Sequence, residues 1–201
     1  MTSSARCGVI ELRQYTMRAG QRDALIALFE REFISPQQAV GAHVLGVFRN
    51  VDDADHFVWM RGYRDMAARG RALPAFYDGP VWQMHRDAAN ATMVRSDDVL
   101  LLRPLTPWPE ERAPGRWQVQ VFAVPTPADD AMRAALRRSA PTWLETQPAP
   151  NNFPRHPIRE GEQVLVALAP GEVLLPPELH ERLAAPIQTL NLQPTLASPL
   201  R

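Results

Sequence analysis

Patterns of apolar and polar residues in the first half of the chain predict the order βαββαβ. Alternating runs rich in β-branched and aromatic residues indicate strands, while apolar residues at helical spacing indicate helices that pack on the sheet. Pro36 should stop the first helix, and Pro80 should start the last one. The predicted strands are 9–15, 43–50, 56–63 and 99–103, and the predicted helices are 20–33, a region from about 64 to 77, and 81–93.

The second half repeats this order with shorter helices. The segment PLTPWPEERAPG, residues 104–115, is rich in proline and should behave as a semi-stiff linker. We therefore predict two domains, 8–104 and 116–201, joined by a linker at 105–115. The predicted strands of the second domain are 117–124, 142–147, 163–169 and 187–192, and its predicted helices are 126–138 and 176–186.

The first half resembles the NIPSNAP family. The similarity is carried by ELRQYTMRAGQRDALIALFEREF, which begins at Glu11, and by AFYDGPVWQMHRDAANATMVRSDDVLLLRP, which ends at Pro104. The resemblance implies a ferredoxin-like βαββαβ unit of the dimeric α/β-barrel type. Beyond these segments, the loop at 148–161 is similar to loops of two-domain bacterial relatives. Because one fold supports many reactions, the resemblance implies architecture and not a reaction.

The same resemblance predicts how the two halves assemble. In this barrel type two four-stranded sheets, usually one from each subunit, pack face to face, and helices cover the outside. A tandem chain can supply both sheets itself, so we expect an α+β protein that forms one rigid body. The alternative is a homodimer in which each half pairs with its counterpart from a second chain.

Composition excludes several classes of function. The formal net charge is zero, so we expect neither nucleic acid nor a membrane as a partner. The apolar runs are shorter than the roughly 20 residues of a membrane span, and the N-terminus has no signal-like apolar segment, so we expect a cytoplasmic protein. The chain contains arginine but no lysine, which excludes the chemistry of Schiff-base and P-loop lysines.

Cysteine usage excludes further sites. Cys7 is the only cysteine, so neither an internal disulfide nor a cysteine-based zinc site can form. We expect Cys7 to lie in a frayed segment before the first strand. The histidines show no metal-ligand spacing, and we predict neither a metal site nor a cofactor.

Alternation along two strands predicts a polar and aromatic patch. The first and third strands are neighbours in a ferredoxin-like sheet, so side chains on one face of each should meet. We predict that Arg13, Trp59 and Arg61 bind a small-molecule ligand and that Tyr15 takes part in catalysis. For Glu11 we favour a structural role as the ion-pair partner of Arg61 or Arg13. The shared faces carry Glu11, Arg13 and Tyr15 on the first strand, and Phe57, Trp59, Arg61 and Tyr63 on the third.

A histidine on the last helix of the first half is the second candidate catalytic residue. His85 should face the core, where an imidazole could act as an acid, a base or a ligand. The alternative is that it only fills space and donates to a carbonyl. Tyr77 and Asn90 are predicted to bind the ligand beside it. The face predicted to point inward consists of Val81, Met84, His85, Ala88 and Thr92.

Three classes of function are compatible with these residues. The first is a protein that binds a small organic molecule, with cofactor-independent oxygenase or isomerase chemistry, and it predicts a closed cavity. The second is a haem protein with His85 as axial ligand, which predicts a much larger cavity. The third is a non-catalytic interaction protein, which predicts a filled interior and an exposed apolar patch. The loop at 148–161 should either cover the barrel mouth or extend into solvent.

Overall fold

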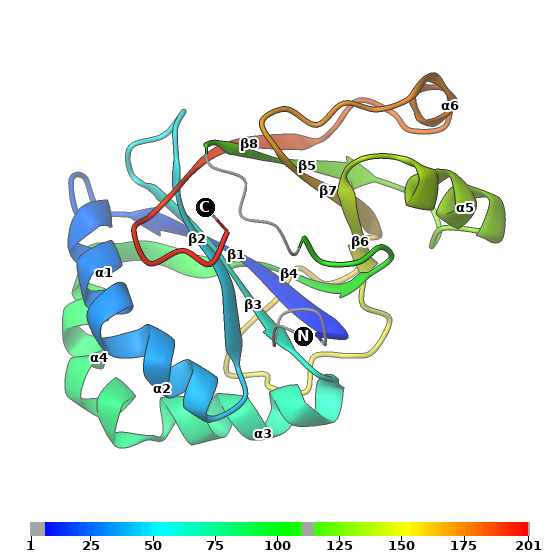
Figure 1. Ribbon diagram of the computed structural model, residues 1–201. Coiled ribbons are helices and arrows are strands. Elements are labelled where there is room, and N and C mark those ends of the chain that lie inside the picture. Colours follow the sequence, from blue (N-terminus) through cyan, green and yellow to red (C-terminus); the bar gives the residue numbers. More distant parts are fainter. Residues whose placement is uncertain (1–6, 110–114, 201) are drawn as a thin grey trace.

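The computed structural model describes residues 7–109 and 115–200, and both halves contain strands and helices in the predicted order (Figure 1). The first half consists of β1 (Val9–Met17), α1 (Arg22–Leu28), the π-helical turn η2 (Phe29–Phe33), α2 (Ile34–Ala39), β2 (His43–Asn50), β3 (His56–Tyr63), α3 (Met66–Tyr77), α4 (Pro80–Thr92) and β4 (Met93–Pro104). The second half consists of β5 (Trp117–Ala123), α5 (Asp130–Arg138), β6 (Thr142–Thr146), β7 (Val164–Pro170), α6 (Pro177–His180) and β8 (Gln188–Pro194).

The strands close into one barrel within a single chain. Their order is β1-β3-β2-β8-β5-β7-β6-β4, so each half contributes four adjacent strands. The halves join where Phe48 of β2 lies opposite Pro194 of β8 and where Leu102 of β4 lies opposite Thr146 of β6. This confirms the predicted α+β barrel of two βαββαβ halves. The domain boundaries and the homodimer stay predictions, and residues 110–114 of the predicted linker lie outside the described residues.

Strand alternation separates an apolar barrel interior from the outer faces that the helices cover. In β1, Ile10 and Leu12 point into the barrel, while Glu11, Arg13 and Tyr15 point outward to the helices. The interior draws its side chains from both halves, and burying each large apolar one contributes about 1.5–3 kcal/mol. This shared core holds the halves together. Its other members include Leu45, Phe48, Val58, Met60, Leu100, Leu102, Trp117, Val119, Leu144, Val166 and Leu190.

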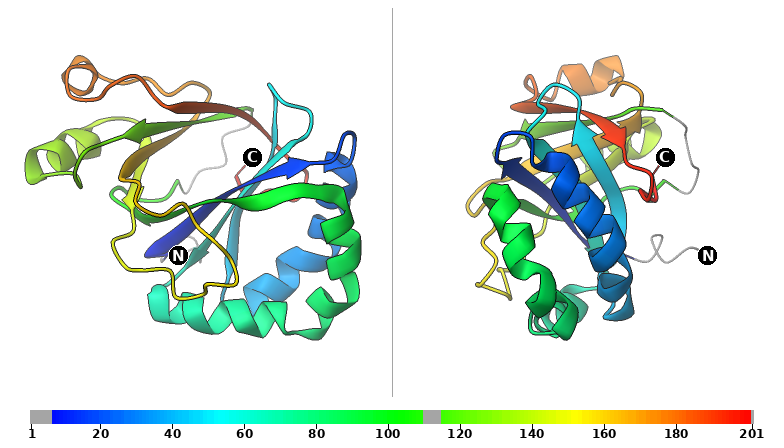
Figure 2. Two further views of the ribbon diagram at one scale, coloured as in Figure 1. Left: turned by 180° about the vertical axis from the view of Figure 1, so that it is seen from behind. Right: turned by 90° about the vertical axis from the view of Figure 1, so that its left-hand side faces the viewer.

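The two outer faces carry very different cover. Helices α1 to α4 lie over the sheet of the first half, whereas only α5 and the short α6 lie at the second half (Figures 1 and 2). Capping side chains start two of these helices. The Asp65 carboxylate accepts from the backbone N–H of Ala68 at 2.7 Å, and that of Asp129 accepts from Met132 at 2.6 Å. The candidate site lies in the first half, between the sheet and the four helices that cover it.

The first helix does not end before Pro36, which corrects the prediction. Helical backbone continues through η2 and α2 to Ala39. The π-helical turn interrupts the regular hydrogen-bond ladder, and α2 starts again at Ile34. Pro36 therefore falls in the first turn of α2, where a missing N–H is tolerated.

Three other elements have a boundary that differs from the predicted one by more than two residues. β4 begins at Met93 and not at 99, because Met93 pairs with Met17 across a bulged stretch of β1. α5 begins at Asp130, after the Asp129 cap and not after Thr126. The predicted helix at 176–186 is helical only over Pro177–His180.

The environment of Cys7 also differs from the prediction. Cys7 is buried and belongs to the barrel core, so it is not frayed. Burial raises the pKa of its thiol to about 11, which keeps it protonated and unreactive at neutral pH. Among the described residues, no helix has both the length and the apolar character needed to cross a membrane.

The loop between β6 and β7 folds back onto the first half. It appears in yellow beside β4 and α3 in Figure 2. Asn152 donates to the carbonyl of Met66 at 2.6 Å, and the Arg159 guanidinium binds Asp98 through two hydrogen bonds. The loop is therefore structured, and it covers the helical side of the first half.

Candidate functional site

A buried carboxylate on β1 forms ion pairs with three arginines, which lie on β1, β3 and α3. Glu11 Oε2 accepts from Arg61 Nε of β3 at 2.7 Å and from Arg13 Nη1 at 2.9 Å. Its Oε1 accepts from Arg69 Nε of α3 at 2.7 Å. Burial alone would raise the pKa of Glu11, but the charges of Arg61, Arg13 and Arg69 outweigh it and lower the pKa below its usual range. Glu11 is thus ionised and has the structural role that we predicted.

This cluster holds more positive than negative charge. The side chains of Glu11, Arg61 and Arg69 are fully buried and that of Arg13 is 2% exposed, so three cations surround one anion and two positive charges are left over. The other hydrogen bonds of these arginines within the described chain go to neutral oxygens of Tyr15, Gln37, Tyr77, Asn151 and Asn152. In addition, Nη2 of Arg61 and of Arg69 is buried without a hydrogen-bond partner there. Such a surplus favours a bound anion.

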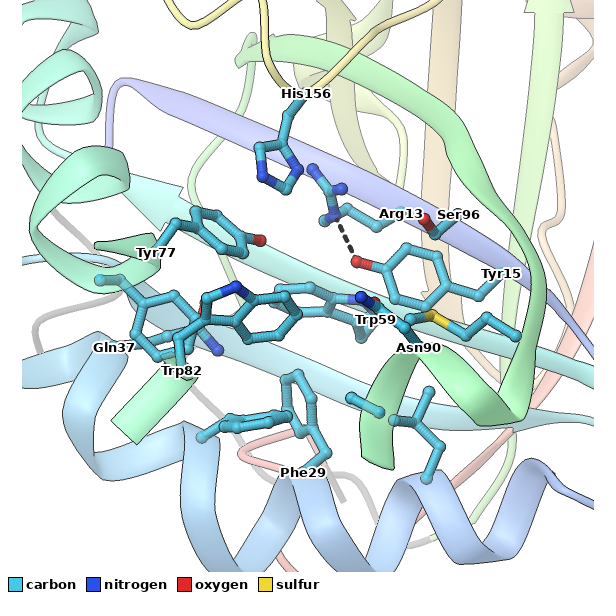
Figure 3. A pocket seen from close by; sticks show the side chains of 15 residues that line it. Arg13, Tyr15, Phe29, Gln37, Trp59, Tyr77, Trp82, Asn90, Ser96 and His156 are labelled. Carbon is cyan, nitrogen blue, oxygen red and sulfur yellow. Dashed lines mark hydrogen bonds between the residues drawn. The ribbon is translucent and has the colours of Figure 1, made fainter. Parts of the chain in front are cut away.

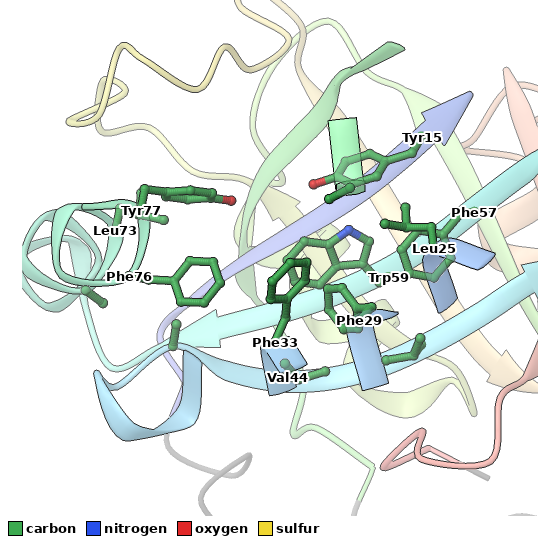
Figure 4. Close-up of a cluster of buried hydrophobic side chains, with 14 of the residues drawn as sticks. Tyr15, Leu25, Phe29, Phe33, Val44, Phe57, Trp59, Leu73, Phe76 and Tyr77 are labelled. Carbon is green, nitrogen blue, oxygen red and sulfur yellow. The ribbon is translucent and has the colours of Figure 1, made fainter. Parts of the chain in front are cut away.

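A cavity lies beside this charge, between the outer face of β1 and β3 and the helices (Figure 3). Its volume is about 70 Å³, and it is partly open to solvent. Its walls are mostly aromatic and meet edge to face, as between Phe29 and Trp59, whose centroids are 4.7 Å apart (Figure 4). The lining residues are Arg13, Tyr15, Leu25, Phe29, Phe33, Gln37, Trp59, Phe76, Tyr77, Trp82, Ala89, Asn90, Met93, Ser96 and His156.

Helix α1 and the π-helical turn present one apolar face to this cavity. Leu25, Phe29 and Phe33 are each four residues apart, and all three line the cavity. Residues at this spacing lie on the same side of a helix, so the pattern places both phenylalanines over the sheet.

Two arginines position two phenol groups at the polar side of the cavity. Arg13 Nε donates to Tyr15 Oη at 3.0 Å. Arg61 Nη1 donates to Tyr77 Oη at 3.3 Å and to Gln37 Oε1 at 2.9 Å. Burial raises the pKa of Tyr15 above its usual value against the opposing charge of Arg13, so Tyr15 carries its proton at neutral pH.

The second half contributes a histidine that sequence reasoning did not select. The ring of His156 stacks on Tyr77 with centroids 4.0 Å apart and lines the cavity. Burial lowers the pKa of His156 to about 3, and the nearby charges of Arg13 and Arg61 act in the same direction. The imidazole is therefore neutral. The only sequence signal was its place in a loop that also holds Phe153.

Most of the predicted ligand-binding residues meet at this cavity. Arg13, Tyr15, Trp59, Tyr77 and Asn90 all line it, although they come from β1, β3, α3 and α4. Arg61 is fully buried behind the wall, where it holds Tyr77. Their roles in binding or catalysis stay predictions. Arg69, a further member of the charge cluster, was missed, although an arginine four residues before Leu73 on a buried helix face was a signal for it.

His85 lies away from the cavity, which corrects its predicted position, whereas Thr92 is buried and Val81 packs against the core as the predicted inward face required. The Nε2 atom of His85 is 3.6 Å from Glu32 Oε2, and the His85 side chain is 24% exposed. Met84 is 76% exposed, and Ala88 is exposed as well. The face that meets the cavity carries Trp82 and Ala89 instead. The indole of Trp82 occupies the space between Phe33 and Tyr77, which fixes the rotation of α4.

Replacing His85 with alanine should therefore change little. The pair with Glu32 is partly exposed and its atoms are 3.6 Å apart, so its loss should lower the free energy of unfolding by no more than about 1 kcal/mol. Urea unfolding of the variant and the wild type measures this directly. A much larger decrease in the free energy of unfolding, or a loss of ligand binding, would show that His85 takes part in the site.

The haem alternative does not fit these residues. His85, its proposed axial ligand, faces Glu32 at the surface and not the cavity. A cavity of about 70 Å³ has no room for a porphyrin. The cavity is partly open to solvent, so it can hold the charged, planar end of a small ligand between the aromatic wall and the positive charge while the rest of the ligand lies in the opening.

Comparisons with known proteins give a family for the first half of the chain. Residues 10–108 match the model of the NIPSNAP family. A NIPSNAP family protein from Agrobacterium tumefaciens str. C58 is 21% identical, with 48% of this chain and 91% of that chain covered and a TM-score of 0.44. The search of curated proteins gives no match.

Two solved structures match both halves. A candidate monooxygenase from Fusobacterium nucleatum is 8% identical, with 92% of this chain and 91% of that chain covered and a TM-score of 0.60. Another from Lactobacillus acidophilus NCFM is 12% identical, with 92% and 93% covered and a TM-score of 0.56. At these identities they show the two-unit barrel and no more. The site of this chain is built largely by the unit that residues 10–108 form, and through that unit the chain belongs to the NIPSNAP family.

Proposed function

We propose that this protein binds a small organic anion with an aromatic or otherwise planar body in the cavity between β1, β3 and the helices. The observation that carries the proposal is the surplus of two buried positive charges beside an aromatic cavity. Uncompensated buried charge is costly, so an anion that enters should be favoured over a neutral molecule of the same shape. Arg13 is the cation of this cluster that lines the cavity.

The walls favour a flat ligand. Trp59 and Phe29 provide apolar surface below the polar groups, and Trp82 closes the side (Figure 3). Aromatic rings prefer edge-to-face or offset contacts, which such a wall can offer to a planar molecule. Arg13 already lies over the rings of Tyr15 and Trp59, at 5.5 Å from each centroid. A planar anion would therefore meet both its charge and its ring partners at once.

Cofactor-independent oxygenase or isomerase chemistry extends this proposal. Both reactions begin from a substrate that loses a proton and becomes a resonance-stabilised anion. A fixed positive field at the site would lower the free energy of such an anion relative to its neutral parent. The positive cluster and the tyrosine hydroxyls support this chemistry, and assays of proton exchange and oxygen uptake with candidate carbon acids would test it.

Benzoate and its neutral isostere benzamide provide the test of binding. Calorimetry should show that benzoate binds at least about tenfold more tightly than benzamide, a difference of roughly 1.4 kcal/mol. Arg13→Met should reduce this preference several-fold, because it removes one of the two surplus charges and the one that lines the cavity. The variant should still fold, because it leaves Glu11 with two arginines and removes one surplus charge. Equal binding of both compounds, or of neither, contradicts the proposal.

A matched variant separates the local charge from net charge. Arg31 is exposed and pairs with Glu32, away from the cavity. Arg31→Met removes the same charge from the chain as Arg13→Met, and it should leave benzoate binding unchanged.

The interaction-protein alternative predicted a filled interior, which the cavity does not match.

A further inference from the structure

Two phenol oxygens at the cavity are already occupied as acceptors. Tyr15 Oη accepts from Arg13, and Tyr77 Oη accepts from Arg61. Among the described residues neither hydroxyl donates to an acceptor. A hydroxyl can donate one hydrogen bond while it accepts others. Each tyrosine therefore has one O–H donor left to offer.

These two donors face the same space. Tyr15 lies on β1 and Tyr77 at the end of α3, and they are only 8% and 7% exposed. Figure 3 shows their hydroxyl groups turned toward each other from opposite sides, below Arg13 and His156. Both residues line the cavity. A single ligand oxygen between them could accept from both.

A third donor at the same wall has no partner. The indole Nε1 of Trp59 is buried and makes no hydrogen bond with a described residue. Figure 4 shows this nitrogen on the side of the ring that faces Tyr15. A buried N–H without an acceptor costs about 1–3 kcal/mol. Together with the two tyrosine hydroxyls, this N–H gives the cavity three donors on one side.

We propose that Tyr15 and Tyr77 form an oxyanion site, which binds the ionised oxygen of a phenol or an enol between their two hydroxyl groups. The inference rests on the proposed anion pocket and names its ligand class as a conjugated oxyanion. The arginine bonds strengthen both hydroxyls as donors, because hydrogen bonds in a chain polarise one another. Donors fixed around one position, with surplus positive charge behind them, are the arrangement that stabilises an oxyanion over its neutral parent.

The ionisation of bound 4-nitrophenol tests this site. The phenolate form is yellow, so a pH titration at saturating protein reports the pKa of the bound probe. We expect that pKa to fall by at least about one unit, which is a tenfold preference for the phenolate. Tyr15→Phe and Tyr77→Phe should each remove most of the shift. An unshifted pKa in the wild-type protein overturns the inference, whether or not the variants fold.

Tyr63→Phe is the matched control. Tyr63 is fully buried beside Arg61, its hydroxyl has no described partner, and it does not line the cavity. Removing this hydroxyl should leave the phenolate preference unchanged. A Tyr63→Phe variant that loses the preference as well would assign the effect to the cluster as a whole and overturn the tyrosine pair.

The benzoate experiment separates this inference from the proposed function. If benzoate binds in preference to benzamide while bound 4-nitrophenol keeps its solution pKa, the anion pocket stands and the oxyanion site fails. If neither benzoate nor 4-nitrophenol binds, both fail. The melting temperatures of Tyr15→Phe and Tyr77→Phe show whether these variants fold. If they fold and bound 4-nitrophenol has the same pKa in them as in the wild type, the oxyanion site is also overturned.

Discussion

Replacing Glu11 with glutamine should lower the free energy of unfolding by about 3–5 kcal/mol. The substitution keeps the size of the side chain but removes the negative charge that Arg13, Arg61 and Arg69 share. All three guanidinium groups are buried, so water cannot take its place. The local surplus rises from two positive charges to three. Since many domains are stable by only about 5–15 kcal/mol, the variant should be marginal or unfolded.

Urea unfolding monitored by circular dichroism measures this loss. Glu32→Gln is the control, because Glu32 pairs with Arg31 and His85 at the surface. It should cost no more than about 1 kcal/mol. If Glu11→Gln folds at all, benzoate should stabilise it more than it stabilises the wild type, because the pocket then carries more positive charge. Wild-type stability in Glu11→Gln would show that the arginines need no carboxylate.

The half of the site that lies on the sheet was predictable from the sequence. Strand alternation places Glu11, Arg13 and Tyr15 on one face, and the neighbouring strand adds Trp59 and Arg61. The observed register sets Glu11 directly opposite Arg61 and Arg13 directly opposite Trp59. Side chains along a strand alternate between two faces of the sheet, so the sequence pattern determines which side chains of neighbouring strands meet.

The helical half was harder to predict for a physical reason. A helix presents a continuous range of faces, and its rotation depends on which bulky side chain finds space first. On α4 that side chain is Trp82, which packs between Phe33 and Tyr77 and turns Met84 to solvent. The predicted inward face was shifted, and His85 was placed with it. The π-helical turn leaves no local signature in the sequence that we could use.

His156 could not be predicted from local patterns because it reaches the site through tertiary contacts. The loop that carries it belongs to the second half, yet Asn151 and Asn152 both accept from Arg69 Nη1, at 3.0 and 2.7 Å. Arg69 in turn donates to Glu11. The buried cluster thus anchors the loop, and the loop supplies one wall of the cavity. This wall lies beyond residues 10–108, which match the family, so the site depends on both halves.

Lowering the pH from 7 to 5 should destabilise the wild type more than a His156→Gln variant. Burial lowers the pKa of His156 to about 3 in the folded protein, whereas an unfolded chain should have a value near 6.5. At a pH between these two pKa values, the imidazole binds a proton in the unfolded state but not in the folded state. The stabilisation is complete above about pH 6.5, and it is lost as the pH falls toward 3. The loss cannot exceed about 1.4 kcal/mol per pH unit, or about 2 kcal/mol at pH 5.

Urea unfolding of both proteins at pH 7, 6 and 5 isolates this contribution. Glu11 does not interfere, because its carboxylate in the unfolded state takes up protons mainly below pH 5. Burial also lowers the pKa of His56, but that residue is present in both proteins and cancels in the difference. His180→Gln, at an exposed position of α6, should follow the wild type. Parallel pH dependence in wild type and His156→Gln would mean that the imidazole is solvated and that the loop does not bury it beside the cavity. A steeper wild-type curve would establish that the second half closes the site, because only a docked loop can keep His156 neutral.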